Sequence, residues 1–175
     1  KSLSSNKWEV LFDRIEAGTY MVAAAITNGH VKINKIKPDT IKIISSKLAE
    51  MGAKINFGDD WVEVDATSSD LIAKNISTEP FPGFPTDMQA QFMALNSISN
   101  GTSVIEETVF ENRFQHVEEL MKMGADISLE KNKALIKGVP NLFGAIVSAS
   151  DLRASASLVL AGLVGKNKTQ IEDIY

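Results

Sequence analysis

One helical pattern with charged residues at its start recurs along this chain of 175 residues. Residues 86–101 read TDMQAQFMALNSISNG, and 64 positions later residues 150–165 read SDLRASASLVLAGLVG. A looser copy, DRIEAGTYMVAAAITNG, stands at 13–29. Each copy begins near an Asp and ends at a Gly, as a capped helix with a left-handed stop would. The chain is therefore predicted to be built by repetition, which brings the same polar residue types to several helix starts.

The repeated unit is larger than this helix. Gly29 and Gly52 lie 23 residues apart, as do Gly101 and Gly124, so that a unit of 72 residues occurs twice. Within each unit the hydrophobic period changes between helical spacing and alternation. The pattern of each unit predicts a helix, a strand, a second helix and a hairpin, in this order. In the first unit these elements span 13–29, 30–36, 38–52 and 53–66. In the second unit they span 87–101, 102–108, 111–124 and 125–138. The predicted fold class is α/β, with a further strand before each first helix.

Three segments fall outside this pattern. Residues 67–86 are rich in Pro, Gly and Phe, and they predict an ordered loop that delivers Asp87 to a helix start. Residues 2–12 alternate like a short strand whose partner the sequence does not identify. A third unit begins at residue 150 but lacks a second helix and a hairpin. Because the chain also starts without Met, it is expected to be a piece of something longer.

The composition is that of one compact domain, with 44% hydrophobic and 23% charged residues. The net charge of −4 comes from interspersed acids and bases, so neither nucleic acid nor a membrane is expected as a partner. The chain has no Cys, and His30 and His116 have no second ligand at metal spacing. No metal or cofactor is therefore predicted, and packing or exposed roles are favoured for both histidines. The lack of Cys does not fix the compartment but is compatible with a reducing cytoplasm, and the protein is expected to be cytoplasmic.

Arginines stand where a helix does not favour them. Arg14, Arg113 and Arg153 fall in the first turn of predicted helices, where a cation opposes the helix dipole at a cost of about 0.3–1 kcal/mol. If these helix starts converge on a cleft, the arginines and the exposed N–H groups form a pocket for carboxylate and phosphate. Alternatively, each arginine pairs with a neighbouring acid such as Asp13 or Asp151.

Asp87 and Asp151 also admit two interpretations. An Asp before a helix commonly caps it by accepting backbone N–H bonds. Thr86 and Ser150 precede these acids and could cap equally well, which would leave both carboxylates to face a ligand. A carboxylate within reach of a sugar hydroxyl could act as a general base, aided by a site that raises its pKa. The sequence leaves both interpretations open.

Three strings identify a family: FPTDMQAQ at 84–91, ETVFENRF at 107–114 and DLRASASLVLAG at 151–162. In this order and spacing they resemble the UDP-N-acetylglucosamine enolpyruvyltransferases, and DRIEAGT at 13–19 extends the resemblance over essentially the whole chain. The resemblance implies an inside-out α/β barrel of βαβαββ units, with helices inside and sheets outside. It also implies that residues 13–175 form most of one such domain, while residues 1–12 reach toward a missing second domain.

The family reaction adds the enolpyruvyl group of phosphoenolpyruvate to the 3′-hydroxyl of UDP-N-acetylglucosamine and releases phosphate, the first committed step of peptidoglycan synthesis. By the resemblance, Asp87 matches the carboxylate proposed as base at that hydroxyl. Val109 matches a position that binds the sugar nucleotide through its backbone, with Phe110 beside it. Arg153 matches an arginine near the phosphoenolpyruvate site. Two further cleft positions are matched by Arg113 and Asp151.

Several parts of the family machinery are absent from this chain. The resemblance implies a Lys-Asn pair, a loop whose Cys or Asp donates a proton, and a further Arg, none of which the sequence contains at a matching position. These 175 residues are therefore predicted not to turn over when isolated. The competing class is a noncatalytic repeat domain that holds an anionic nucleotide or a partner protein.

Overall fold

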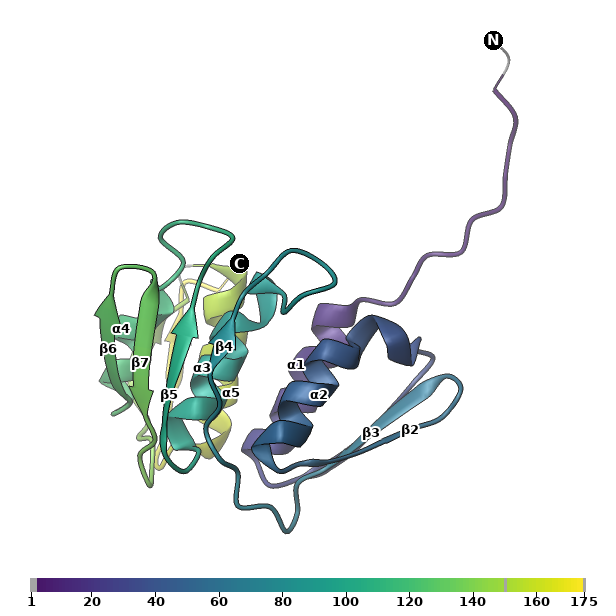
Figure 1. Ribbon diagram of the computed structural model, residues 1–175. Coiled ribbons are helices and arrows are strands. Elements are labelled where there is room, and N and C mark those ends of the chain that lie inside the picture. Colours follow the sequence, from purple (N-terminus) through teal and green to yellow (C-terminus); the bar gives the residue numbers. More distant parts are fainter. Residues whose placement is uncertain (1–2, 150, 175) are drawn as a thin grey trace.

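The computed structural model describes residues 3–149 and 151–174 (Figure 1). The first group of elements is α1 (Arg14–Ile26), β1 (His30–Asn34), η1 (Pro38–Ile41), α2 (Lys42–Met51), β2 (Lys54–Phe57) and β3 (Trp61–Asp65). The second group is β4 (Ile76–Ser77), η2 (Thr86–Met88), α3 (Gln89–Ile98), β5 (Thr102–Glu106), α4 (His116–Lys122), β6 (Asp126–Glu130) and β7 (Lys133–Lys137). The last group is β8 (Ile146–Ser148), α5 (Leu152–Val164) and β9 (Gln170–Glu172).

The strands pair in a recurring order. β3 pairs antiparallel with both β1 and β2, and β7 pairs in the same way with both β5 and β6. β4 joins the second sheet as a parallel neighbour of β5, and β8 pairs in parallel with β9. The predicted strands before α3 and α5 are thus confirmed, because each pairs with the strand that follows its helix.

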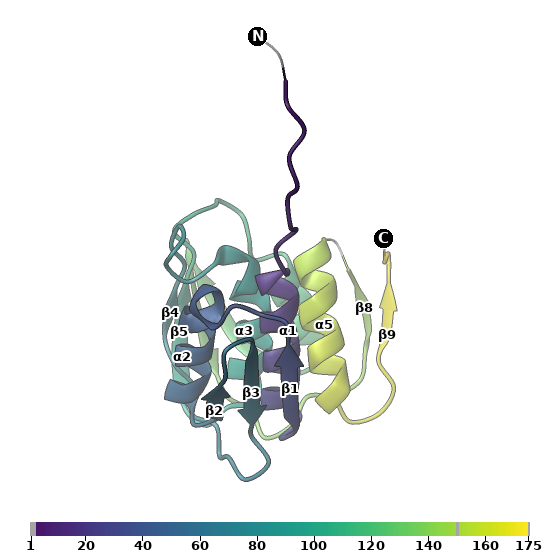
Figure 2. The same ribbon diagram turned by 90° about the vertical axis from the view of Figure 1, so that its right-hand side faces the viewer.

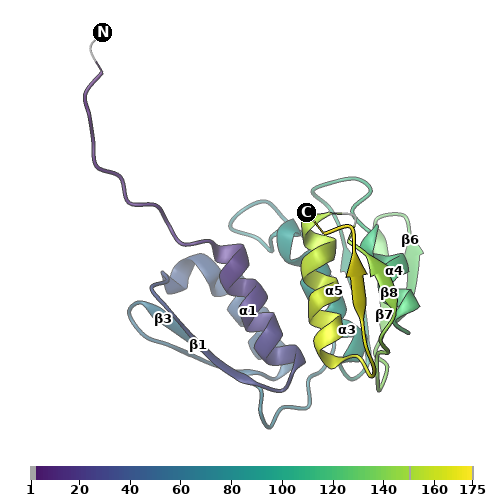
Figure 3. The same ribbon diagram turned by 180° about the vertical axis from the view of Figure 1, so that it is seen from behind.

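Helices α1, α3 and α5 contact one another in the middle of the molecule, and the strands lie outside them (Figures 2 and 3). α3 lies deepest, since every residue from Gln89 to Ser97 is buried. A helix buried on all sides needs small or apolar residues around most of its circumference. The fully buried Phe92 packs edge-on against Phe84, with ring centroids 5.0 Å apart. The core therefore anchors α3 and the η2 turn before it, which carries Asp87.

Glycines follow the second helix of each unit, as the sequence predicts. Gly52 has φ +112° directly after α2, and Gly124 has φ +91° shortly after α4. Both values lie in the left-handed region, which glycine enters without a side-chain clash. Each glycine turns the chain out of a helix and into a strand of the following hairpin.

The helix predicted from Glu111 starts only at His116. Asn112 has φ +55°, a left-handed conformation that interrupts an α-helix. Residues 107–115 form a loop instead. Arg113 therefore lies in a loop, and the prediction that it belongs to a first helical turn is wrong.

The strand predicted over residues 2–12 is wrong for the described residues 3–12. They extend away from the rest of the protein (Figure 1), and Trp8 and Val10 are 86% and 89% exposed. A strand needs a neighbour for its backbone hydrogen bonds. None of the described strands pairs with this segment, and β1, which follows α1, pairs with β3.

Gly138 follows β7 where two backbones approach closely. A Cβ atom at this position would lie 1.7 Å from the Ser99 carbonyl oxygen, at the end of α3. We expect Gly138→Ala to lower the free energy of unfolding by about 1–3 kcal/mol, measured by urea denaturation of the chain. Lys137→Ala, at the exposed neighbouring residue, should change it by less than about 0.5 kcal/mol. Equal effects of the two substitutions would contradict the close-contact argument.

Candidate functional site

Two arginines from distant segments meet at Asp87. Asp87 lies in η2, and its Oδ1 accepts hydrogen bonds from Arg153 Nε at 2.5 Å and from Arg113 Nη1 at 3.2 Å. Arg153 comes from α5, 66 positions along the chain, and Arg113 from the loop after β5, 26 positions along. The predicted convergence of charged residues on one place is therefore confirmed for these three side chains.

Asp87 does not cap the helix that it precedes. η2 starts after Pro85 and α3 starts after Met88, and neither start has a side-chain capping bond. The Thr86 hydroxyl donates to the Glu107 carboxylate at 2.8 Å. The capping interpretation is therefore wrong for Asp87, whose carboxylate serves as the meeting point of the two guanidinium groups.

Asp151 is a helix cap. Its Oδ1 accepts the backbone N–H of Arg153 at 2.7 Å, in the first turn of α5. Its backbone carbonyl accepts the Ser155 hydroxyl at 3.0 Å. Ser150, the alternative cap, lies outside the described residues. Asp151 thus holds the start of α5 and, with it, the backbone of the arginine that contacts Asp87.

Arg14 lies apart from this cluster. It begins α1, which Asp13 caps by accepting two backbone N–H groups. The Arg14 guanidinium carbon lies 5.1 Å from the centroid of the Phe81 ring, within cation–π range. The expectation that all three helix-start arginines share one pocket is therefore wrong for Arg14, because the loop before α3 offers it an aromatic face.

The pKa of Asp87 moves in the direction opposite to the prediction. Burial alone would raise the pKa of this carboxyl, but hydrogen bonds and positive charge from Arg153 and Arg113 outweigh burial and hold the pKa below its usual range. The predicted upward shift is wrong. Asp87 is ionised at neutral pH, and it becomes a stronger base when its contacts with the arginines weaken.

Cavities adjoin the cluster on several sides. One of about 440 Å³ lies between the starts of α1 and α5, where Asp87 and Arg153 line it. Another of about 280 Å³ lies toward α4 and is lined by Arg113 and Arg153. A larger one of about 830 Å³ follows residues 107–115 and includes Arg113. The two arginines therefore connect the three spaces, and an anionic group in any of them would meet a guanidinium.

The loop after β5 carries the predicted sugar-nucleotide positions Val109 and Phe110. Their N–H groups donate to Glu107 Oε1 at 3.0 and 3.1 Å. The Phe110 side chain is half exposed, and the Arg113 guanidinium carbon lies 4.1 Å from its ring centroid. Glu107 is not among the residues predicted from the sequence, because the side chains that typically accept nearby backbone N–H groups are the shorter ones of Ser, Thr, Asn and Asp.

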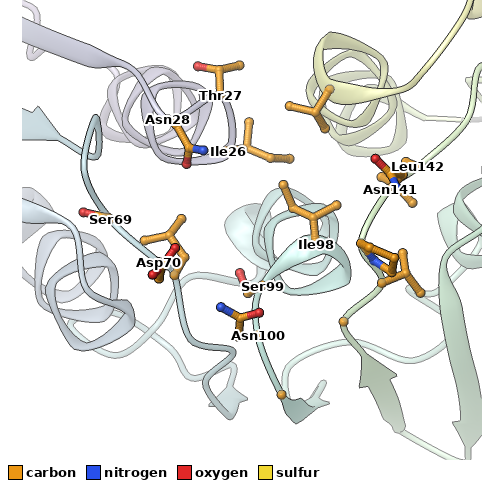
Figure 4. A pocket seen from close by; sticks show the side chains of 16 residues that line it. Ile26, Thr27, Asn28, Ser69, Asp70, Ile98, Ser99, Asn100, Asn141 and Leu142 are labelled. Atoms are coloured by element: carbon orange, nitrogen blue, oxygen red, sulfur yellow. The ribbon is translucent and has the colours of Figure 1, made fainter.

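A further cavity of about 640 Å³ lies at the other ends of the central helices (Figure 4). Asn28 and Asn100, which follow α1 and α3, contribute to it together with Asp70. Asp70 is the ionisable side chain among its described lining residues. Helix C-termini carry partial negative charge, so this end does not attract anions. The arginines that favour an anion, Arg113 and Arg153, lie at the opposite end with Asp87.

His116 is buried, as the packing interpretation predicts, and burial lowers its pKa to about 4 against the opposing charge of Asp151. His30 Nε2 lies 3.1 Å from Glu63 Oε1 at the surface. Among residues 3–149 and 151–174, no group of three or more His, Asp or Glu side chains could hold a metal ion. In the same part of the chain, no helix combines the length and the apolar character that crossing a membrane requires.

Curated relatives match almost the whole chain. The UDP-N-acetylglucosamine 1-carboxyvinyltransferase of Coxiella burnetii (strain Dugway 5J108-111) is 54% identical over 173 residues, which are 99% of this chain and 40% of that protein. The enzyme of the same name from strain RSA 331 / Henzerling II matches to the same extent. The chain thus spans about 40% of the length of the curated relatives it matches.

Solved structures share the fold. The enolpyruvyl transferase NikO from Streptomyces tendae has a TM-score of 0.83 at 24% identity, covering 94% of this chain and 39% of that one. EPSP synthase from Acinetobacter baumannii has a TM-score of 0.70 at 18% identity, covering 95% and 40%. The family model described as EPSP synthase (3-phosphoshikimate 1-carboxyvinyltransferase) matches residues 1–175. This chain therefore belongs to the EPSP synthase family.

Proposed function

We propose that this chain is part of an enzyme that transfers the enolpyruvyl group of phosphoenolpyruvate to the 3′-hydroxyl of UDP-N-acetylglucosamine and releases phosphate. The 54% identity to a UDP-N-acetylglucosamine 1-carboxyvinyltransferase supports this substrate pair. The observation that carries the proposal is the ionised Asp87 between two arginines, at the end of the protein where helices α3 and α5 begin. Such an enzyme would serve peptidoglycan synthesis in a bacterial cytoplasm.

Within this proposal the cluster divides into two roles. Asp87 accepts the proton of the sugar 3′-hydroxyl, and the loop with Val109 and Phe110 holds the sugar nucleotide. Arg113 and Arg153 offer donors to the carboxylate or phosphate of phosphoenolpyruvate. Asp151 holds the start of α5, from which Arg153 projects. When substrate draws the arginines toward its own anionic groups, Asp87 becomes the better base.

Residues 13–175 would form most of an inside-out barrel with the central helices inside, and residues 1–12 would reach toward a second domain. The exposed side chains of Trp8 and Val10 are consistent with a partner surface for that segment. Because the chain spans about 40% of its curated relatives, the remaining substrate contacts and the proton donor would come from that second domain.

The test is phosphate release in the presence of phosphoenolpyruvate and UDP-N-acetylglucosamine. The full-length parent protein should release phosphate only when both substrates are present. The isolated chain should release none, because the proton donor and half of the sugar site lie elsewhere. Turnover by the isolated chain would contradict the division of the site. A parent that binds the sugar nucleotide without any turnover would favour the noncatalytic binding domain.

A further inference from the structure

A buried carboxylate joins the two halves of the candidate site. Glu107 follows β5 and is 3% exposed. Its Oε1 accepts the Thr78 hydroxyl at 2.9 Å and the N–H groups of Val109 and Phe110 at 3.0 and 3.1 Å. Its Oε2 accepts the Thr86 hydroxyl at 2.8 Å. One side chain thus binds the loop of the proposed sugar site and the residue next to the proposed base.

The hydrogen bond from Thr86 to Glu107 Oε2 determines how the Thr86 hydroxyl can interact with its other neighbour, Arg113. Because the Thr86 proton points to Glu107, the lone pairs of the Thr86 oxygen remain available to a donor. Arg113 Nη1 lies 3.4 Å from that oxygen and 3.2 Å from Asp87 Oδ1. Glu107 therefore fixes the direction of the Thr86 hydroxyl. The Thr86 oxygen can then accept a hydrogen bond from Arg113 and help to hold its guanidinium nitrogen against Asp87.

The Oε1 contact determines the shape of the loop. The Thr78 hydroxyl donates to Glu107 Oε1, and its oxygen accepts the N–H of Thr108 at 2.9 Å, so Thr78 links a third backbone group of the loop to the same carboxylate. The Glu107 backbone is held in turn by Asn132, with bonds of 2.9 and 3.0 Å. Glu107 holds two consecutive N–H groups of the loop directly and a third through Thr78, which restricts movement of the loop relative to the end of β5.

We propose that Glu107 is a positioning residue for the transfer reaction, which keeps the sugar-binding loop and the Thr86–Asp87–Arg113 group in a fixed relation. This inference rests on the proposed function. Oε1 acts through the loop and so affects sugar binding, whereas Oε2 acts through Thr86 and Arg113 and so affects proton transfer. A purely structural carboxylate would not separate the two effects.

The first measurement compares Glu107→Gln with Glu106→Gln in the full-length parent. The amide replaces one acceptor oxygen with a donor, so we expect kcat/KM to fall by about 10–100-fold. Glu106 is the neighbouring acid on β5, where it pairs with Lys133 at the surface, and its substitution should leave kcat/KM within about twofold. Equal values for the two variants, in an active parent, would overturn the inference and leave the proposed function intact.

The second set of measurements tests the Oε1 and Oε2 contacts separately and needs no substitution of Glu107. Thr78→Val should raise KM for UDP-N-acetylglucosamine about tenfold with a smaller change in kcat. Thr86→Val should lower kcat about tenfold and move the acid limb of its pH profile upward, because a loosened Arg113 no longer holds the pKa of Asp87 down. Serine at either position should restore most of the loss.

Two results would overturn the positioning role. In the first, Thr86→Val and Thr86→Ser have the same kinetics and the same acid limb as the wild type. In the second, all variants lose activity only in proportion to their folded fraction, measured by circular dichroism. A wild-type parent with no phosphate release would instead refute the proposed function, and the positioning role with it.

Discussion

Replacing Asp87 with asparagine in the full-length parent should lower kcat by about 10²–10⁴-fold, the range that a positioned general base contributes. Asparagine has nearly the same shape but cannot accept the proton of the sugar hydroxyl. Binding of UDP-N-acetylglucosamine, measured by calorimetry, should change by only a few-fold, since the loop with Val109 and Phe110 is untouched. The loss should therefore appear in kcat and not in the sugar affinity.

The matched control is Asp126→Asn, which removes an exposed acid at the start of β6. It should leave both kcat and sugar binding unchanged. An Asp87→Asn enzyme with wild-type kcat would exclude the base role and favour a site that only binds anions. A variant that loses sugar binding as well as turnover would show that Asp87 acts through the local structure, since its ion pairs with Arg113 and Arg153 are then needed for the fold of the site.

Acidification from pH 6.5 to 4 should cost the chain about 3 kcal/mol of stability through His116 alone. Burial lowers the pKa of His116 to about 4, whereas an unfolded histidine titrates near 6.5. At pH values between these limits the unfolded chain binds a proton that the folded chain does not. Stability therefore falls as the pH falls through this window, and the difference of about 2.5 pKa units corresponds to about 3 kcal/mol.

Urea denaturation at pH 7 and at pH 4.5, followed by circular dichroism, measures this loss. His116→Gln should reduce the difference between the two pH values, because glutamine binds no proton in either state. His30→Gln removes the other, exposed histidine and should retain most of the wild-type loss. A pH difference that is the same in the wild type and in His116→Gln would assign the acid sensitivity to the carboxylates.

Local patterns were sufficient for most of the fold. The helical spacing of Met88, Phe92 and Leu95 predicts α3, and the glycines at 52 and 124 mark the ends of the second helices. Alternation predicts both hairpins, whose strands pair in antiparallel register. These features depend on residues within a few positions of one another. A single sequence is therefore enough to recognise them.

The exceptions depend on contacts between distant segments. The helix predicted from residue 111 starts late because Asn112 has a left-handed conformation, in a loop that follows Glu107, which bonds to Thr78 and Thr86, 29 and 21 positions away. The strand predicted near the start of the chain does not form in the described residues 3–12, because none of the described strands pairs with its backbone. Local periodicity carries no information about either kind of partner.

By itself, the sequence determined most of the helices and strands and their order, and it placed Asp87, Asp151 and Arg153 near helix starts, because helix and strand formation depends on neighbouring residues and their hydrophobic period. Only the tertiary structure decided which charges meet. Arg113 and Arg153 pair with Asp87, while Arg14 packs on Phe81. It also decided that the pKa of Asp87 is lowered and not raised. Ion pairs act over a few ångströms, and those distances exist only after helices from separate segments have packed together.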